Sequence, residues 1–128
     1  MIEYVERRRC RRFEIPDAKV RYKKIGLLVF RKASSTTYPV VNVSKGGLGF
    51  VCDEKFRQGQ KVMLQLLAPK ETPLNLLAQI RWQGQVRADT IVGVKFMRFG
   101  WRKGLNSMET LDVLRRLEAQ HGKGEKED

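Results

Sequence analysis

Two short runs are rich in β-branched and aromatic residues, YPVVNVS at 38–44 and LGFVCD at 48–53, and in the second Leu48, Phe50 and Cys52 fall at alternate positions. Alternation with a period of two is typical of a strand that buries one face. The pair Gly46-Gly47 stands between the runs and supplies the backbone freedom that a tight turn needs. The pattern therefore predicts a β-hairpin.

Further runs of this kind lie on both sides of the hairpin. They are predicted as strands around Phe13 and Ile15, from Val20 to Phe30 after a bend at Pro16-Asp17, and at 60–68, 74–86 and 90–99. Short strands at such even spacing indicate an all-β barrel or sandwich.

The segment from Asn106 to Gln120 changes to a helical period, because apolar residues recur at spacings of three. Ser107 stands where an N-cap is expected, and the apolar stripe consists of Met108, Leu111, Leu114 and Leu117. We expect this helix to cover one end of the β-structure. The predicted organisation is a flexible basic arm at 1–12, one domain at 13–120 and a polar tail at 121–128.

Positive charge is concentrated near the beginning of the chain. The 128 residues contain 26 Lys and Arg against 14 Asp and Glu, a net charge of +12. Residues 1–32 hold 11 of the basic and only 4 of the acidic residues, with five arginines in the six positions from 7 to 12. Such a cluster favours a polyanionic partner, which could be a nucleic acid, an anionic membrane surface or a phosphorylated small ligand.

The apolar runs are too short for a membrane-spanning helix, which needs about 20 residues. The first residues, MIEYVERRRCRR, have no apolar stretch after their charges and do not resemble a signal peptide. We therefore expect a cytoplasmic protein with no membrane span.

Nothing in the sequence indicates an enzyme. The glycine loops, nucleophile elbows and metal-binding motifs of common enzyme classes are missing, and the single histidine, His121, lies in the polar tail. Cys10 and Cys52 lack metal-type spacing and are expected to be free thiols. We expect a non-enzymatic protein without a metal ion or a cofactor.

Two stretches offer chemistry for a ligand. The arm ERRRCRRF presents guanidinium groups, which bind phosphates and also match the O6 and N7 acceptors of guanine. The turn NVSKGG offers the amide of Asn42, the hydroxyl of Ser44 and backbone N–H groups that glycines leave accessible. A ligand that contains both guanine and phosphate would satisfy both stretches.

These residues carry a resemblance to a known family. Arg8 to Arg12 fits the motif RxxxR, and Asn42 to Gly47 fits [D/N]xSxxG about thirty residues later. Together the motifs resemble those of PilZ domains, bacterial receptors for the second messenger cyclic di-GMP, over roughly residues 6–99. The resemblance implies a six-stranded antiparallel β-barrel with a C-terminal helix, and a ligand site that includes Arg8, Arg12, Asn42, Ser44 and Gly47.

The register of the first motif has an alternative, because Arg7 and Arg11 also fit RxxxR. Arg8 and Arg12 are preferred, since the strand predicted at Phe13 then follows the second arginine directly. Arg7 then precedes the motif. In the family an arginine at that position accompanies the binding of two intercalated cyclic di-GMP molecules, which adds Arg7 to the implied site.

The resemblance implies a cytoplasmic adaptor that changes conformation when it binds cyclic di-GMP and passes the signal to a protein partner. One alternative is a small basic β-barrel that binds nucleic acid, although no exposed aromatic pairs are predicted along a strand. Another is a PilZ-type module that contacts proteins without binding ligand. Asn42 and Ser44 are also common turn residues, and Trp82 is expected to pack on a face or rim of the barrel.

Overall fold

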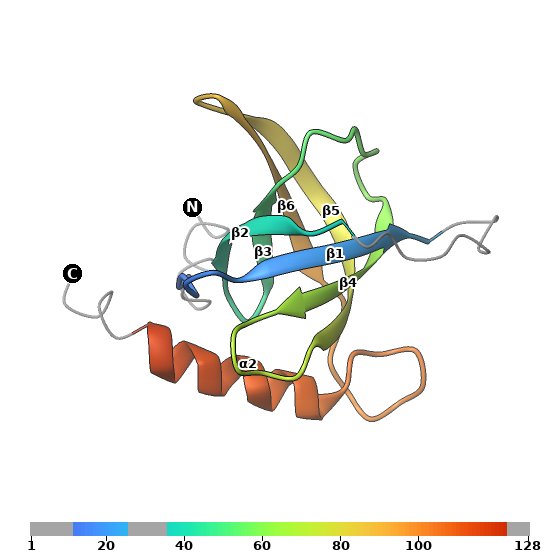
Figure 1. The fold of residues 1–128 in the computed structure, drawn as a ribbon. Helices are drawn as coiled ribbons and strands as arrows, with labels where there is room; N and C mark the ends of the chain where they lie inside the picture. The colour runs from blue at the N-terminus through green and yellow to red at the C-terminus, as the bar shows by residue number, and fades with distance from the viewer. Residues whose placement is uncertain (1–11, 26–35, 123–128) are drawn as a thin grey trace, which may run out of the picture.

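The computed structural model describes residues 12–25 and 36–122 (Figure 1). Within these residues the elements are β1 (Lys19–Lys24), β2 (Tyr38–Val43), β3 (Gly47–Val51), β4 (Lys61–Leu67), β5 (Leu74–Val86), β6 (Asp89–Phe96) and α2 (Met108–His121). The six described strands close into a barrel in the order β1-β2-β3-β6-β5-β4, and each neighbouring pair is antiparallel. The predicted six-stranded barrel with a C-terminal helix is confirmed.

The barrel forms because alternate residues of each strand point inward. In β4 the side chains of Val62, Leu64 and Leu66 are fully buried, whereas the residues between them face outward. Burial of each such side chain contributes about 1.5 to 3 kcal/mol. The predicted face of β3 is also confirmed, since Leu48 and Phe50 are buried together with Cys52, which follows the strand.

The strand predicted around Phe13 and Ile15 is wrong in extent. Phe13 forms only an isolated bridge with Val43, and the first barrel strand begins at Lys19. Pro16 has no N–H to donate to a ladder, and Asp17 adopts a left-handed φ of 62°, so the chain turns before β1 begins. The strand predicted from Val20 to Phe30 is described only as far as β1 and the residue that follows it, because residues 26–35 lie outside the described part.

Helix α2 starts at the predicted cap, where Ser107 Oγ accepts a hydrogen bond of 3.0 Å from the backbone N–H of Thr110. Leu114 and Leu117 join the buried core, and the helix lies beneath the barrel in the view of Figure 1. The other two residues of the predicted stripe, Met108 and Leu111, are only half-buried.

Two polar contacts hold the helix and the loop before it against the barrel. The buried side chain of Asn106 accepts from Leu77 N at 2.7 Å and donates to the carbonyls of Leu77 and Met97 at 3.0 and 2.9 Å. Arg116 of α2 donates two hydrogen bonds, of 2.7 and 2.9 Å, to the carboxylate of Glu71 in the loop between β4 and β5. This fixes the position of α2 relative to β5.

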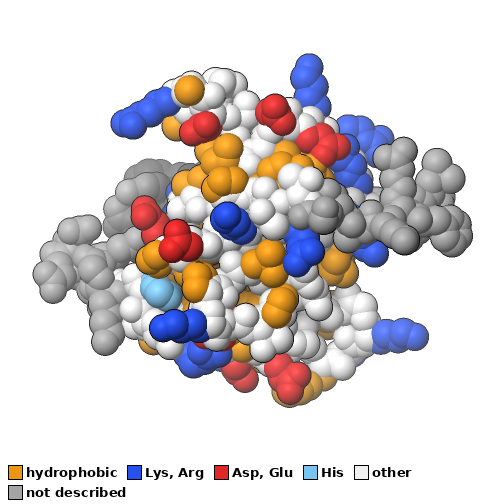
Figure 2. All heavy atoms as spheres, viewed as in Figure 1, with side chains coloured by type: hydrophobic (Ala, Val, Ile, Leu, Met, Phe, Trp, Pro, Cys, Tyr) orange, Lys and Arg blue, Asp and Glu red, His pale blue; other side chains and the backbone are white. Residues whose placement is uncertain are grey.

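Charges are mixed over the face of the barrel that Figure 2 shows, where acidic side chains stand between Lys and Arg. The run of arginines from 7 to 12 lies outside the described residues apart from Arg12. Among the described helices none is long and apolar enough to span a membrane. The same residues contain no group of three or more His, Cys, Asp or Glu that could hold a metal ion.

Candidate functional site

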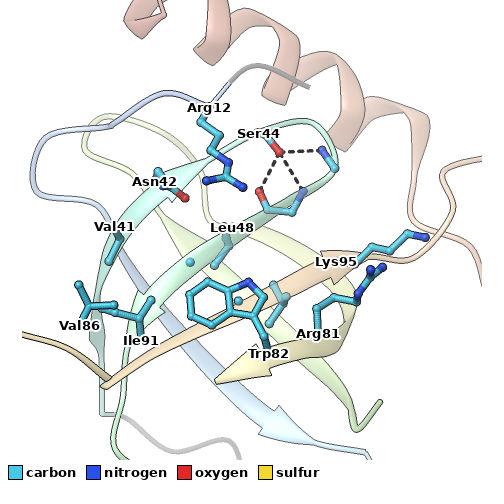
Figure 3. A pocket seen from close by; sticks show the side chains of 15 residues that line it. Arg12, Val41, Asn42, Ser44, Leu48, Arg81, Trp82, Val86, Ile91 and Lys95 are labelled. Atoms are coloured by element: carbon cyan, nitrogen blue, oxygen red, sulfur yellow. Dashed lines mark hydrogen bonds between the residues drawn. The ribbon is translucent and has the colours of Figure 1, made fainter. Parts of the chain in front are cut away.

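A hollow of about 430 Å³ lies on the outer face of β2, β3, β6 and β5 (Figure 3). Its floor is a row of residues that pair across these four strands: Asn42 opposite Gly49, Gly49 opposite Gly93, and Gly93 opposite Trp82. Because the two central positions are glycines, neither contributes a side chain of its own to the middle of the row. The hollow is therefore a consequence of register, with Asn42 on one side and Trp82 on the other.

The indole of Trp82 lies directly against Gly93. A Cβ atom added to Gly93 would lie 2.3 Å from the indole Nε1, closer than real Cβ contacts allow. Trp82 nevertheless remains 50% exposed, so the rest of its ring faces the hollow and solvent. Gly93 therefore provides the space that places an aromatic surface at the edge of the hollow.

A β-bulge lies on each side of the floor. The register shifts between Val40 and Asn42 in β2, and again between Ile80 and Trp82 in β5. A bulge lets two consecutive residues leave the inward-outward alternation. As a result the pairs 41–42 and 81–82 line the same hollow on the outside of the barrel.

The turn at one end of the hollow is organised by Ser44. Its Oγ accepts hydrogen bonds from the backbone N–H groups of Gly46 and Gly47 at 3.1 and 3.2 Å, and Ser44 N donates to Gly47 O at 2.8 Å. A Cβ atom on Gly47 would lie only 2.0 Å from the carbonyl oxygen of Val94 in β6. Ser44 thus caps the turn, and Gly47 allows the close approach of β3 to β6. Both residues also line the hollow.

Arg12 reaches the hollow because the residue after it is anchored. Phe13 is fully buried and exchanges two backbone hydrogen bonds of 2.8 Å with Val43, the last residue of β2. The side chain of Arg12 is exposed and extends toward the hollow between Asn42 and Ser44 (Figure 3).

The structure therefore brings together four of the residues predicted for the site, namely Arg12, Asn42, Ser44 and Gly47. Arg7 and Arg8 lie outside the described residues, so their place in the site stays a prediction.

Other lining residues were not predicted from the sequence. Arg81 and Lys95 add two cations, and Trp82 adds an aromatic ring that was expected only to pack on the barrel. Three of the four large hydrophobic side chains exposed in the described part, Val41, Trp82 and Val86, gather at this hollow. The break in alternation at Arg81-Trp82 is the sequence signal that could have indicated an outward-facing pair. It shows that the pair lines a hollow only when the pairing of Trp82 with Gly93 is known.

The charge of the hollow suits an anion. Among the described residues that line it, three carry positive charge, Arg12, Arg81 and Lys95, and none carries negative charge. Hydrogen bonds from charged donors to an anion are about twice as strong as neutral ones. A second described hollow, of about 450 Å³ near the start of α2, is lined by no charged side chain. The first hollow is therefore the better candidate for an anionic ligand.

Two ionisable groups near the hollow, Cys52 and Tyr38, have pKa values that are shifted by burial in the barrel. Burial is the main cause that raises the pKa of the Cys52 thiol above its ordinary value of 9.0, and burial also raises the pKa of Tyr38. Cys52 is a free thiol that is 3% exposed. It belongs to the packed interior and takes no part in the hollow.

The comparison with protein families decides the classification. The family model of the PilZ domain matches residues 6–100. The chain belongs to the PilZ domain family. This match covers both motifs, so the resemblance stated from the sequence is confirmed. A search of the curated proteins found no match.

Solved structures show the same PilZ fold. The PilZ domain with c-di-GMP of YcgR from Escherichia coli aligns with a TM-score of 0.67 and 13% identity, over 94% of this chain and 95% of that chain. The structure of the Bacillus subtilis inhibitor of motility, MotI/DgrA, aligns with a TM-score of 0.60 and 16% identity, over 89% of this chain and 52% of that chain. At these identities the likeness concerns the fold of the PilZ barrel.

Proposed function

We propose that this PilZ domain is a bacterial cytoplasmic receptor for cyclic di-GMP, and that it acts as an adaptor toward a protein partner without being an enzyme. The observation that carries the proposal is the position of Arg12, which is held by the Phe13 bridge beside Asn42 and the Ser44 turn. A cationic hollow on a PilZ barrel, with Arg12 of the first motif and the Asn42–Gly47 turn of the second at its edge, supports a ligand that combines guanine and phosphate.

Arg12 and the described turn supply complementary groups. The guanidinium of Arg12, together with Arg8 and Arg7, donates to phosphate oxygens or to the O6 and N7 atoms of guanine. The amide of Asn42 donates and accepts at a base edge. Ser44 Oγ is already an acceptor for two N–H groups, but its own hydroxyl hydrogen has only a long contact of 3.4 Å with Gly47 O. That hydrogen is available to a ligand acceptor.

Trp82 and the apolar rim are suited to a purine base. A base stacked on an aromatic side chain gains about 1 to 3 kcal/mol. Val41, Val86 and Ile91 extend the apolar surface around the ring. The hollow thus offers a stacking surface on the Trp82 side and hydrogen-bonding groups on the Asn42 side, the division that a guanine nucleotide requires.

The conformational response that we propose is ordering of the arm. Residues 1–12 close over the bound ligand against the face that carries Asn42 and Ser44, and this changes the surface that a partner protein contacts. The YcgR domain of similar fold was solved with c-di-GMP, and MotI is an inhibitor of motility. Both support a ligand-controlled adaptor and leave the identity of the partner open.

We also propose that two cyclic di-GMP molecules bind at saturation, because Arg7 adds a cation beside Arg8 and Arg12 where four phosphates would gather. Replacement of Arg7 by Leu should shift the saturating ratio toward one. Calorimetric titration of both proteins with an independently measured active fraction checks this. A ratio of one for the parent protein contradicts double occupancy.

Equilibrium dialysis with labelled cyclic di-GMP tests the proposed function. Unlabelled cyclic di-GMP should displace the label, whereas cyclic di-AMP, GTP and a single-stranded oligonucleotide at equal phosphate concentration should not. The Asn42→Ala variant should lose this binding, since a nucleic-acid site that uses phosphates alone would not depend on one amide. Displacement by the oligonucleotide, or no saturable binding, would show that the proposal is wrong.

A further inference from the structure

Two cations on the other side of the hollow from Arg12 belong to neither family motif. Arg81 lies at the bulge of β5, and Lys95 lies on the adjacent strand β6 (Figure 3). Lys95 pairs with Gln79, which faces outward two residues before Arg81. Residues in this relation are diagonal neighbours on one face of a sheet. The bulge therefore brings a guanidinium and an ammonium to the same edge of the hollow.

Neither cation is neutralised by a carboxylate of the described residues. The ion pairs of that part of the chain involve Lys24, Lys45, Arg115 and Arg116. Both Arg81 and Lys95 are exposed and border a hollow without acidic lining. Neighbouring like charges repel each other, and an anion placed between them removes that repulsion.

The width of the hollow separates this pair from Arg12. Asn42 on β2 and Trp82 on β5 are three strand spacings apart, about 14 Å at 4.7 to 4.9 Å per spacing. Arg12 lies on the β2 side, whereas Arg81 and Lys95 lie beyond Trp82. A ligand that carries one phosphate near Arg12 and another at a distance can be contacted from both sides.

We propose that Arg81 and Lys95 form a second anion subsite, which binds the phosphodiester farther from Arg12 while Trp82 stacks on the adjoining base. The proposal rests on the proposed function, because it assigns a further part of the same ligand. Its consequence is selectivity: a dinucleotide with two separated phosphates uses both subsites, and a mononucleotide uses only one.

The test uses a double variant, Arg81→Gln with Lys95→Gln, in the full chain. A matched control, Arg57→Gln with Lys19→Gln, removes the same charge from exposed positions outside the hollow. A second variant, Arg81→Lys with Lys95→Arg, keeps both charges. The dissociation constant for cyclic di-GMP is measured by calorimetry at low and at high salt, and urea unfolding verifies that each variant is folded.

We expect the Gln double variant to bind roughly tenfold more weakly at low salt, the scale of one lost hydrogen bond to a charged group. Its affinity should also fall less with added salt, because two cations no longer contribute to a screened attraction. The control should match the parent, and the charge-conserving variant should retain most of the affinity.

Three results would overturn the subsite. If the parent binds and the Gln double variant shows the same dissociation constant and salt dependence, the subsite is wrong while the proposed function stands. If affinity falls but the salt dependence is that of the parent, the pair contacts an uncharged base edge instead of a phosphate. If the parent itself does not bind cyclic di-GMP, the proposed function fails and the subsite with it. Should the double variant be unfolded, the single Lys95→Gln variant gives the same comparison.

Discussion

Phe13 and Val43 exchange two backbone hydrogen bonds of 2.8 Å, and both side chains are fully buried in the barrel. This bridge joins the end of the arginine arm to the last residue of β2. Because the bridge is antiparallel, Arg12, which precedes Phe13, lies across from Ser44, which follows Val43, and its side chain extends between Ser44 and Asn42. One pair of core residues thus connects the two motifs that lie about thirty residues apart.

Replacement of Arg12 by Ala should weaken cyclic di-GMP binding by about 1 to 3 kcal/mol, the value of a bidentate contact. Its side chain is exposed, so the free energy of unfolding should stay close to that of the parent. Calorimetric titration and urea unfolding measure the two quantities. Arg57→Ala, an exposed arginine outside the hollow, is the control. Equal affinities for both variants would remove Arg12 from the site.

Replacement of Ser44 by Ala should reduce both stability and binding. The N–H groups of Gly46 and Gly47 lose their acceptor, which costs about 1 kcal/mol of unfolding free energy, and the ligand loses the hydroxyl donor. Ser107→Ala is a matched control, because loss of the α2 cap costs about 1 kcal/mol at a position outside the first hollow. If both variants bind like the parent, Ser44 serves the turn alone.

Replacement of Gly93 by Ala should displace the indole of Trp82, since the added Cβ would lie 2.3 Å from Nε1. Gly84→Ala is the control, because nothing lies within 4 Å of a Cβ at that position of the neighbouring strand. Fluorescence in a Trp101→Phe background reports on Trp82 alone, and dialysis reports binding. We expect a changed emission spectrum and weaker binding for Gly93→Ala only. A parental spectrum and affinity would show that the position of Trp82 does not depend on Gly93.

The contact between Glu71 and Arg116 should make part of the stability dependent on pH. The hydrogen bonds from Arg116 lower the pKa of Glu71 below its ordinary value of 4.5. A carboxyl whose pKa is lower in the folded protein stabilises the fold above the ordinary value, and this stabilisation is lost as the pH falls through the folded value. The melting temperatures of the parent and of Glu71→Gln should therefore differ at pH 7 and converge in acid.

Because Arg116 is half exposed and Glu71 keeps 17% of its side chain exposed, solvent reaches this ion pair, and added salt should reduce the difference at pH 7. Glu14→Gln, which also removes one exposed carboxylate but lies outside this contact, is the control for the loss of a negative charge. A constant difference between the parent and Glu71→Gln from pH 7 to pH 3 would contradict this explanation of the α2 attachment.

The strands and the β2–β3 hairpin could be predicted because their signals are local. The alternation in β4 and the glycine pair at the start of β3 do not depend on the rest of the fold. The segment at Phe13 was predicted incorrectly, because its apolar pattern resembles a strand while Pro16 and Asp17 interrupt the ladder. Its single bridge depends on Val43, which is distant in sequence.

The motif half of the site could be predicted, and the half on β5 and β6 could not. Asn42, Ser44 and Gly47 lie on one hairpin, so their spacing in the sequence already places them together. Trp82 meets Gly93 only through the register of β5 with β6, and Arg81 faces outward only because that register shifts. Register is set by tertiary packing, which a single sequence does not show.

The most direct test of the central claim is an amide and indole NMR titration of the full chain with cyclic di-GMP. The two indoles are natural reporters, because Trp82 lines the hollow and Trp101, which is 87% exposed, lies outside it. We predict saturable shifts of the Trp82 indole and of the amides of Gly47, Gly49 and Gly93, with the Trp101 indole unchanged. Shifts confined to Trp101 and its loop, or no saturable shift at the glycines of the floor, would contradict the account.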